Sequence, residues 1–97
     1  MPDNYAKIWT TIYNDEWFLG LSAIQRSGWL QLIITAKIHG DTGLVSGRSR
    51  ASIGSLWGCD GKTTGKILRK FLDDGKIRLK ENSSGVIVIE IVKYEYW

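Results

Sequence analysis

Residues 60–75, DGKTTGKILRKFLDDG, decide the fold because they carry a complete helix signal. Asp60 is a favourable N-cap, since its side chain accepts hydrogen bonds from free backbone N–H groups and its charge suits the positive end of a helix. Gly75 suits the position after the last turn, where glycine readily adopts the left-handed conformation. The stretch therefore predicts a helix from Gly61 to Asp74.

At about 100° per residue, this helix has two chemically different sides. One side is apolar and is expected to pack on the core; it consists of Ile67, Leu68, Phe71 and Leu72, with Thr64 beside them. The opposite side carries Lys62, Lys66, Arg69 and Asp73, flanked by Thr63 and Lys70. Lys and Arg neutralise phosphates or bind guanine edges, and Thr bonds phosphate or contacts a thymine methyl group. The pattern indicates a helix that presents a nucleic-acid-binding surface.

The segments on either side of this helix predict a helix-turn-helix followed by a hairpin. A shorter helix is expected from Ser49 to Trp57, with Ile53, Leu56 and Trp57 turned inward, and residues 58–60 form a tight turn. Residues 77–80 alternate as a strand, 81–85 suit a hairpin loop, and 86–94 (VIVIEIVKY) have strong β propensity. Residues 44–46 suffice for one short additional strand.

A central helix is expected to begin after Ser22. Ser22 and Gln25 fit a capping box, in which each side chain satisfies a free backbone N–H at the other position. Apolar residues then cover most of the helix circumference as far as Ala36, which is typical of a helix at the centre of a fold, and residues 40–43 end it. Upstream, residues 5–13 suit either a strand or a helix, and Trp17 and Phe18 are expected to enter the core from a short turn-like or helical stretch.

The order of these elements predicts an α+β fold, a winged helix-turn-helix with about three main helices, a small antiparallel sheet and a wing hairpin. We expect one domain over residues 1–97. It divides into an N-terminal extension (1–21), a helical core (22–75) whose helix-turn-helix spans 49–75, and the wing hairpin (76–97).

Composition excludes several classes of protein. The chain has 97 residues with one Cys and one His, so neither an internal disulfide framework nor a four-ligand zinc site is expected within it. No apolar run approaches the roughly 20 residues of a membrane span, and the first residues lack the pattern of a signal peptide, so a cytoplasmic location is expected. Gly61-Lys62-Thr63 resembles part of a phosphate-binding loop, but Leu56 stands where that motif requires glycine. We therefore expect no enzyme activity, no metal and no cofactor.

Charge is distributed unevenly along the chain. Residues 48–80 contain nine basic and three acidic residues, a balance of +6, whereas the rest of the chain has four basic and seven acidic residues, a balance of −3. Such asymmetry favours a polyanionic partner, although Lys-rich helices also serve solubility alone. The expected partner is double-stranded DNA, and the candidate binding residues are Arg48, Arg50, Lys62, Thr63, Lys66, Arg69, Lys70, Arg78 and Lys80.

These candidates rest on different arguments. Arg48 and Arg50 precede the second helix, where helix-turn-helix proteins often contact phosphate. Lys76, Arg78 and Lys80 alternate with apolar residues and are expected to share one face of a strand, where they either contact DNA or protect the sheet edge. Gly61 and Gly65 either pack tightly or let the helix start approach a phosphate.

Three further predictions concern side chains outside the basic surface. Cys59 is expected to be a buried structural thiol, and His39 the C-terminal residue of the central helix. Most tryptophans are assigned to the core. Tyr96 and Trp97 are the exceptions, because aromatic residues at a chain end are expected to form an interface or to mark a truncated boundary.

Several stretches resemble the N-terminal winged-helix domain of phage replisome organisers and the related DnaD-type replication initiators. They are Asp15-Glu16-Trp17-Phe18 with Leu21-Ser22 and Arg26, the run from Ile67 to Ile77, and the closing strand Ile89-Glu90-Ile91-Val92-Lys93-Tyr94. The resemblance implies origin DNA binding and self-association. It also implies recruitment of a helicase or helicase loader, which in that family involves a C-terminal region absent from this sequence.

Two alternatives stay open at this point. The same fold serves transcriptional regulators, which the sequence does not separate from replication initiators. The domain is alternatively an oligomerisation or protein-interaction module that touches no DNA and associates through its terminal aromatic residues, Tyr5, Trp9, Tyr13, Tyr94, Tyr96 and Trp97.

Overall fold

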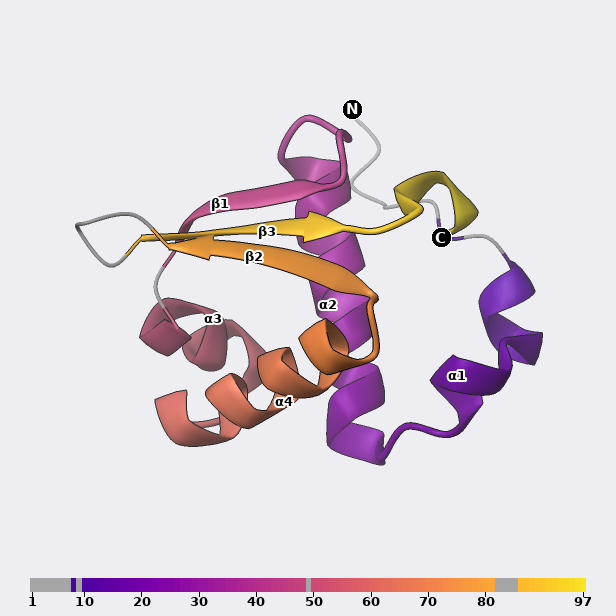
Figure 1. The fold of residues 1–97 in the computed structure, drawn as a ribbon, viewed down its shortest axis with the longest axis horizontal. Coiled ribbons are helices and arrows are strands. Elements are labelled where there is room, and N and C mark those ends of the chain that lie inside the picture. Colours follow the sequence, from indigo (N-terminus) through magenta and orange to yellow (C-terminus); the bar gives the residue numbers. More distant parts are fainter. Residues whose placement is uncertain (1–7, 9, 49, 82–85) are drawn as a thin grey trace, which may run out of the picture.

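The computed structural model describes residues 8, 10–48, 50–81 and 86–97, and shows an α+β fold (Figure 1). Over this part of the chain, four α-helices accompany a three-stranded sheet. The helices are α1 (Glu16–Leu19), α2 (Ala23–Ile38), α3 (Arg50–Trp57) and α4 (Gly61–Asp73). The strands are β1 (Leu44–Arg48), β2 (Ile77–Glu81) and β3 (Ile87–Ile91), and two 3-10 helices, η1 (Thr10–Asn14) and η2 (Tyr94–Tyr96), lie near the chain ends. None of the described helices is long and apolar enough to cross a membrane.

The sheet is antiparallel, with β3 between β1 and β2. In β2 and β3 the residues alternate between two faces, and one face is buried: it carries Ile77, Ile87, Ile89 and Ile91. Helices α2, α3 and α4 cover this buried face (Figure 1). The sheet therefore covers one side of the core, and no described helix packs on its opposite face.

Helix α2 forms the centre of the core, as its apolar pattern predicts. The capping box is present, because Ser22 Oγ accepts from the Gln25 backbone and Gln25 Oε1 accepts from the Ser22 backbone. The buried side chains are those of Trp29, Leu32, Ile33 and Ala36. The expectation of burial around most of the circumference as far as Ala36 is only partly right, since Leu30 and Ile34 are half-buried. His39 is the C-cap, in agreement with its predicted position.

The turn between α3 and α4 is fixed by one cluster of short contacts. Asp60 is the N-cap of α4, and its Oδ1 accepts from Thr63 N at 2.7 Å. The buried Thr64 hydroxyl donates to the Asp60 carbonyl oxygen at 2.7 Å and lies 3.2 Å from Cys59 Sγ. Cys59 is half-buried and packs against the core, so the prediction that it is buried is only partly right. The predicted end of α4 is also confirmed, because Gly75 has a φ of 72°.

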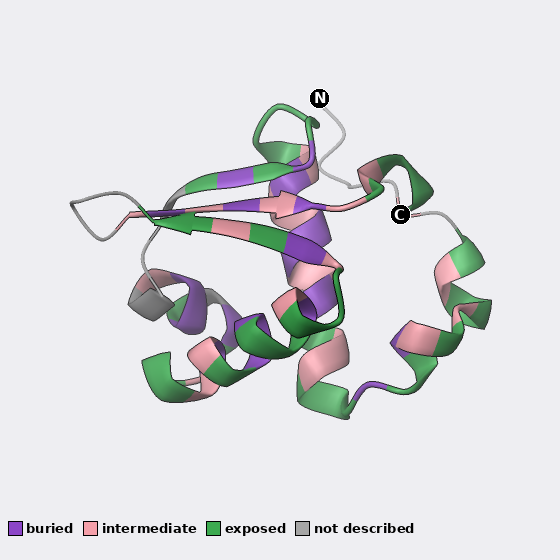
Figure 2. Cartoon of the chain, in the orientation of Figure 1, coloured by how far each residue is buried: buried purple, intermediate pink, exposed green. Residues whose placement is uncertain are grey.

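The described N-terminal segment (residues 10–19) and the segment after β3 both pack on the core, and only the entry of Trp17 and Phe18 was predicted from the sequence. The strand predicted as far as Tyr94 ends at Ile91, because Lys93 adopts the left-handed conformation (φ 52°) and turns the chain into η2. In the N-terminal stretch 5–13, the described part forms the start of η1, while residues 1–7 and 9 lie outside the description. Figure 2 shows buried residues along α2 and on the strands of the sheet, between these terminal segments and helices α3 and α4.

The prediction that Trp97 lacks a core to enter is wrong. Trp97 is only 3% exposed, and its ring packs edge-on against Trp29, with centroids 5.2 Å apart, and against Trp17 at 6.1 Å. Tyr96 remains 44% exposed and donates from its hydroxyl to Asp15 at 3.0 Å. The carboxylate acceptor raises the pKa of the Tyr96 hydroxyl. Trp17 and Phe18 reach the core from α1 as predicted, Trp17 being half-buried and Phe18 buried.

Candidate nucleic-acid interface

Helix α4 has a buried side and an exposed side, as its sequence predicts. Thr64, Ile67, Leu68 and Phe71 are buried, and Phe71 packs edge-on against Trp29 with ring centroids 5.1 Å apart. The exposed side carries Lys62, Lys66, Arg69 and Asp73, which follow one another at intervals of four, three and four residues. We call these four residues the α4 stripe. Because α4 is anchored in the core along its other side, the stripe is held outward.

The N-terminal half of the stripe contains two free cations. Lys62 and Lys66 are exposed, and neither forms an ion pair with another described residue. Thr63, a predicted DNA contact, bonds Asp60 through both its backbone and its side chain, and these bonds lower the pKa of Asp60. The Lys66 charge lowers that pKa further. At neutral pH, this end of α4 therefore presents two ammonium groups above one capping carboxylate.

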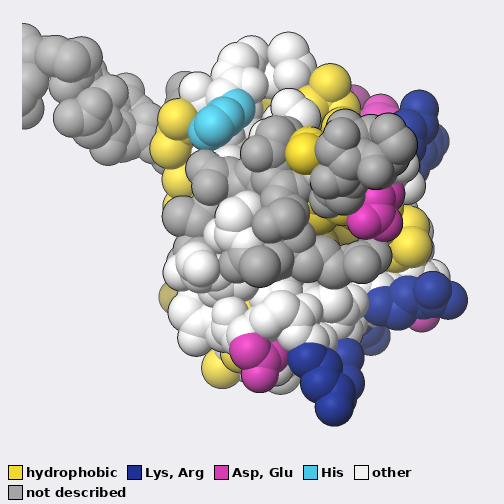
Figure 3. Space-filling model, turned by 90° about the vertical axis from the view of Figure 1, so that its left-hand side faces the viewer, with side chains coloured by type: hydrophobic (Ala, Val, Ile, Leu, Met, Phe, Trp, Pro, Cys, Tyr) yellow, Lys and Arg dark blue, Asp and Glu magenta, His cyan; other side chains and the backbone are white. Residues whose placement is uncertain are grey.

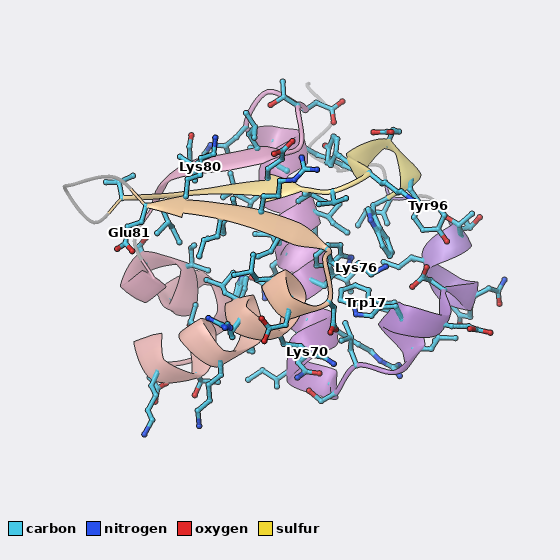
Figure 4. The ribbon with its side chains drawn as sticks, in the orientation of Figure 1. Trp17, Lys70, Lys76, Lys80, Glu81 and Tyr96 are labelled. Atoms are coloured by element: carbon cyan, nitrogen blue, oxygen red, sulfur yellow. The ribbon has the colours of Figure 1, made fainter. Side chains whose placement is uncertain are left out.

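In the C-terminal half of α4, two cations form ion pairs with carboxylates four residues later in the sequence. Arg69 Nε lies 3.0 Å from Asp73 Oδ1, and the two side chains are 74% and 58% exposed. Lys70 Nζ lies 3.1 Å from Asp74 Oδ2. Trp17 Nε1 donates to the same Asp74 oxygen at 2.7 Å, and this bond, followed by the contact with Lys70, lowers the pKa of Asp74. Lys70 is thus tied to the packing of α1 against α4 (Figure 4).

The basic residues of the hairpin lie on a different surface from the stripe. Arg78 and Lys80 point to the sheet face opposite the helices, because they alternate with Ile77 and Leu79 on the inner face. Arg78 Nη1 is 3.3 Å from Glu90 Oε1 on the neighbouring strand, and Lys80 has no ion pair among the described residues. The expectation that Lys76 shares their strand face is wrong, since Lys76 precedes β2 and places its Nζ 5.0 Å from the Trp17 ring centroid (Figure 4).

Two predicted residues are placed only by their backbone. Arg48 is the last residue of β1 and Arg50 the first of α3, while their side chains lie outside the described part of the structure, as do residues 82–85 at the hairpin tip. Figure 3 views the side of the molecule that carries the hairpin end and the start of α4, and shows Lys and Arg side chains projecting from its lower part and its right-hand edge.

A groove of about 400 Å³ runs between α4 and β2 beside the stripe. Leu68, Leu72 and Leu79 line it together with Gly61 and Gly65, and Lys62 and Arg69 stand at its border. A Cβ at Gly61 meets no atom within 4 Å, so the tight-packing explanation is wrong for that glycine. This bare surface leaves the first turn of α4 accessible along the groove.

A glycine that does allow a close approach beside this helix is Gly54, which was not predicted from the sequence. A Cβ at this position lies 2.6 Å from the Cys59 carbonyl oxygen and 2.6 Å from Thr64 Oγ1. Gly54 therefore lets α3 contact the turn that orients α4. The available signal was a glycine inside a predicted helix, where it costs about 1 kcal/mol relative to alanine.

In the described part of the chain, no group of three His, Cys, Asp or Glu side chains is arranged to hold a metal ion. Comparison of the chain with models of protein families, with curated proteins and with solved structures finds no match.

Proposed function

We propose that this chain is a winged helix-turn-helix domain that binds double-stranded DNA through α4. The order α2, β1, α3, α4, β2, β3 and the sheet order β1-β3-β2 support this interpretation of the α+β fold. The observation that carries the proposal is the α4 stripe, in which Lys62, Lys66 and Arg69 are exposed opposite the buried side of the same helix.

The binding mode follows from the dimensions of the helix and of DNA. A 13-residue helix is roughly 20 Å long, and the major groove of B-DNA, about 12 Å wide, admits an α-helix. Lys62 and Lys66 are suited to phosphates because they are point charges that form no ion pair with another described residue. Arg69 is suited to a phosphate or a guanine edge because its guanidinium donates two parallel hydrogen bonds.

Within this proposal, replication initiation is the role that the resemblance to replisome organisers favours. The target is then origin DNA, and the further partners are the helicase or helicase loader that such proteins recruit. A transcriptional regulator would use the same α4 surface. Binding to a replication origin rather than to a promoter separates the two roles, and mapping of the bound genomic sites measures it.

Mobility-shift titration with duplex DNA at several salt concentrations tests DNA binding. We expect Lys62→Gln/Lys66→Gln to weaken binding at least tenfold at 0.1 M salt. The slope of log affinity against log salt should fall by about 1.8, because each phosphate contact contributes about 0.9.

The matched control removes the same charge elsewhere: Lys37→Gln/Lys93→Asn alters two cations that are outside α4, one at the end of α2 and one after β3. Its affinity should stay within about threefold of the wild type, since charges distant from the bound DNA are largely screened. Equal losses in both double variants would contradict the assignment of α4, and no shift of DNA by the wild type at low salt would overturn the proposed function.

A further inference from the structure

The cations of α4 fall into two classes, which differ in whether an acidic residue forms an ion pair with them. Lys62 and Lys66 are free of ion pairs among the described residues, whereas Arg69 and Lys70 each face a carboxylate one turn later, at 3.0 and 3.1 Å. Asp73 and Asp74 stand at the C-terminal end of the helix. A negative charge is unfavourable there because it meets the negative end of the helix dipole. Asp73 and Asp74 therefore destabilise this end of the helix, and their ion pairs with Arg69 and Lys70 offset that destabilisation.

The two carboxylates are held differently. Asp74 Oδ2 accepts a hydrogen bond from Trp17 Nε1 at 2.7 Å and also forms an ion pair with Lys70. Trp17 is itself packed against Trp29, with ring centroids 4.8 Å apart. Asp74 thus belongs to the contact between α1 and α4. Asp73 has Arg69 as its partner, and both side chains are more than half exposed, so this pair can open without disturbing the core.

Asp73 also occupies the DNA-facing surface itself. It is the fourth member of the stripe, directly in line with Lys62, Lys66 and Arg69. A phosphate that approaches Arg69 meets a carboxylate whose Oδ1 already lies 3.0 Å from Arg69 Nε and that repels a second anion. Binding of the phosphate then requires Arg69 to exchange one anion for another.

We propose that Asp73 is a built-in competitor for phosphate: it occupies Arg69 in the free protein and so limits the affinity of the α4 stripe for DNA. This inference rests on the proposed function. Binding then begins at Lys62 and Lys66, and Arg69 joins only when a phosphate displaces Asp73. An exposed ion pair is weak enough for such exchange to occur readily.

The test compares three variants in the salt-dependent mobility shift. Asp73→Asn should bind about three- to tenfold more tightly at 0.1 M salt, with a salt slope steeper by about 0.9, because Arg69 becomes a full phosphate contact. Glu95→Gln makes the same change in net charge on the exposed η2 helix and should change affinity less than twofold. In the Arg69→Gln background, Asp73→Asn should give no more than a twofold gain, since the released cation is absent.

The possible outcomes distinguish a failure of the competitor role of Asp73 from a failure of DNA binding itself. If the wild type binds DNA and Asp73→Asn behaves like Glu95→Gln, Asp73 is not a competitor. If Asp73→Asn keeps its full gain without Arg69, the effect is general repulsion and the exchange at Arg69 is refuted. Failure of the wild type and of Asp73→Asn to shift DNA at low salt would instead remove the proposed function itself.

Discussion

At the level of single residues, Gly54 controls how α3 meets the α3–α4 turn. Gly54→Ala should lower the free energy of unfolding by about 2–3 kcal/mol, because the new methyl group overlaps the backbone of Cys59 and the buried Thr64 hydroxyl. Chemical denaturation followed by circular dichroism measures the loss. Gly61→Ala is the matched variant: its methyl group enters open space, and a change between zero and a gain of about 1 kcal/mol is expected. Equal stability of the two variants would show that the approach at Gly54 is not tight.

Predictions for single residues are confirmed where the position of the side chain depends on the local sequence. The exposed position of Lys62, Lys66 and Arg69 follows from helical periodicity alone, so it was predictable. The pairing of Arg69 and Lys70 with carboxylates four residues later was equally visible in the sequence and was not anticipated. Gly54 and Trp97 depend on which distant atoms approach them, and no periodic pattern records such contacts.

At the level of elements, the helix ends were predicted well because caps act within one turn. Ser22, Asp60 and Gly75 lie where the sequence placed them. The end of β3 was not predictable from propensity, since Val92 and Tyr94 both favour strands. The left-handed conformation of Lys93 overrides that preference, and the packing of Trp97 against Trp29 accompanies the turn.

The contact between α1 and α4 makes stability depend on pH through Asp74. The hydrogen bond from Trp17, with Lys70 adding to it, lowers the pKa of Asp74 below its usual 3.8. A lowered folded-state pKa stabilises the protein above the unfolded value, and this contribution is lost as the pH falls below about 4 through the folded-state pKa. Asp74→Asn should therefore be less stable than the wild type at pH 7, and the difference should shrink as the pH falls below 4.

Denaturant titrations at pH 7, 4 and 3 measure this difference. Trp17→Phe, which removes the N–H donor and retains an aromatic ring, should reduce the acid sensitivity in the same direction. A constant difference between Asp74→Asn and the wild type over this range would contradict the linkage between Asp74 and folding.

At the level of the whole molecule, the sequence predicted an α+β arrangement because helices and strands follow one another in an interpretable order. It did not predict that the C-terminal segment packs on α2 beside α1, because that arrangement joins Trp17 and Trp97 across 80 positions of sequence. The basic residues of β2 were likewise grouped with those of α4, because their relative position in space is a long-range feature of the fold. The three-dimensional structure separates them, since Arg78 and Lys80 lie on the outer sheet face.

The packing of the C-terminal segment on α2 predicts that Trp97 is necessary for stability, although it is the last residue of this sequence. Its ring fills the space beside Trp29, and truncation of a buried Trp to Ala typically costs about 3–5 kcal/mol. A domain of this size has only about 5–15 kcal/mol in total, so Trp97→Ala should be strongly destabilised or unfolded at 37 °C. Trp97→Phe should lose less and remain folded, because a smaller ring still contacts Trp29.

The control for Trp97 is Tyr13, an aromatic residue that is 82% exposed near the other end of the chain. Tyr13→Ala should change stability by no more than about 0.5 kcal/mol, because almost no apolar surface is uncovered by its removal. Thermal melts followed by near-ultraviolet circular dichroism report both unfolding and the packing of the tryptophan rings. If Trp97→Ala and Tyr13→Ala melt at the same temperature, Trp97 does not pack into the core, and the contact of the C-terminal segment with α2 is not part of the folded state.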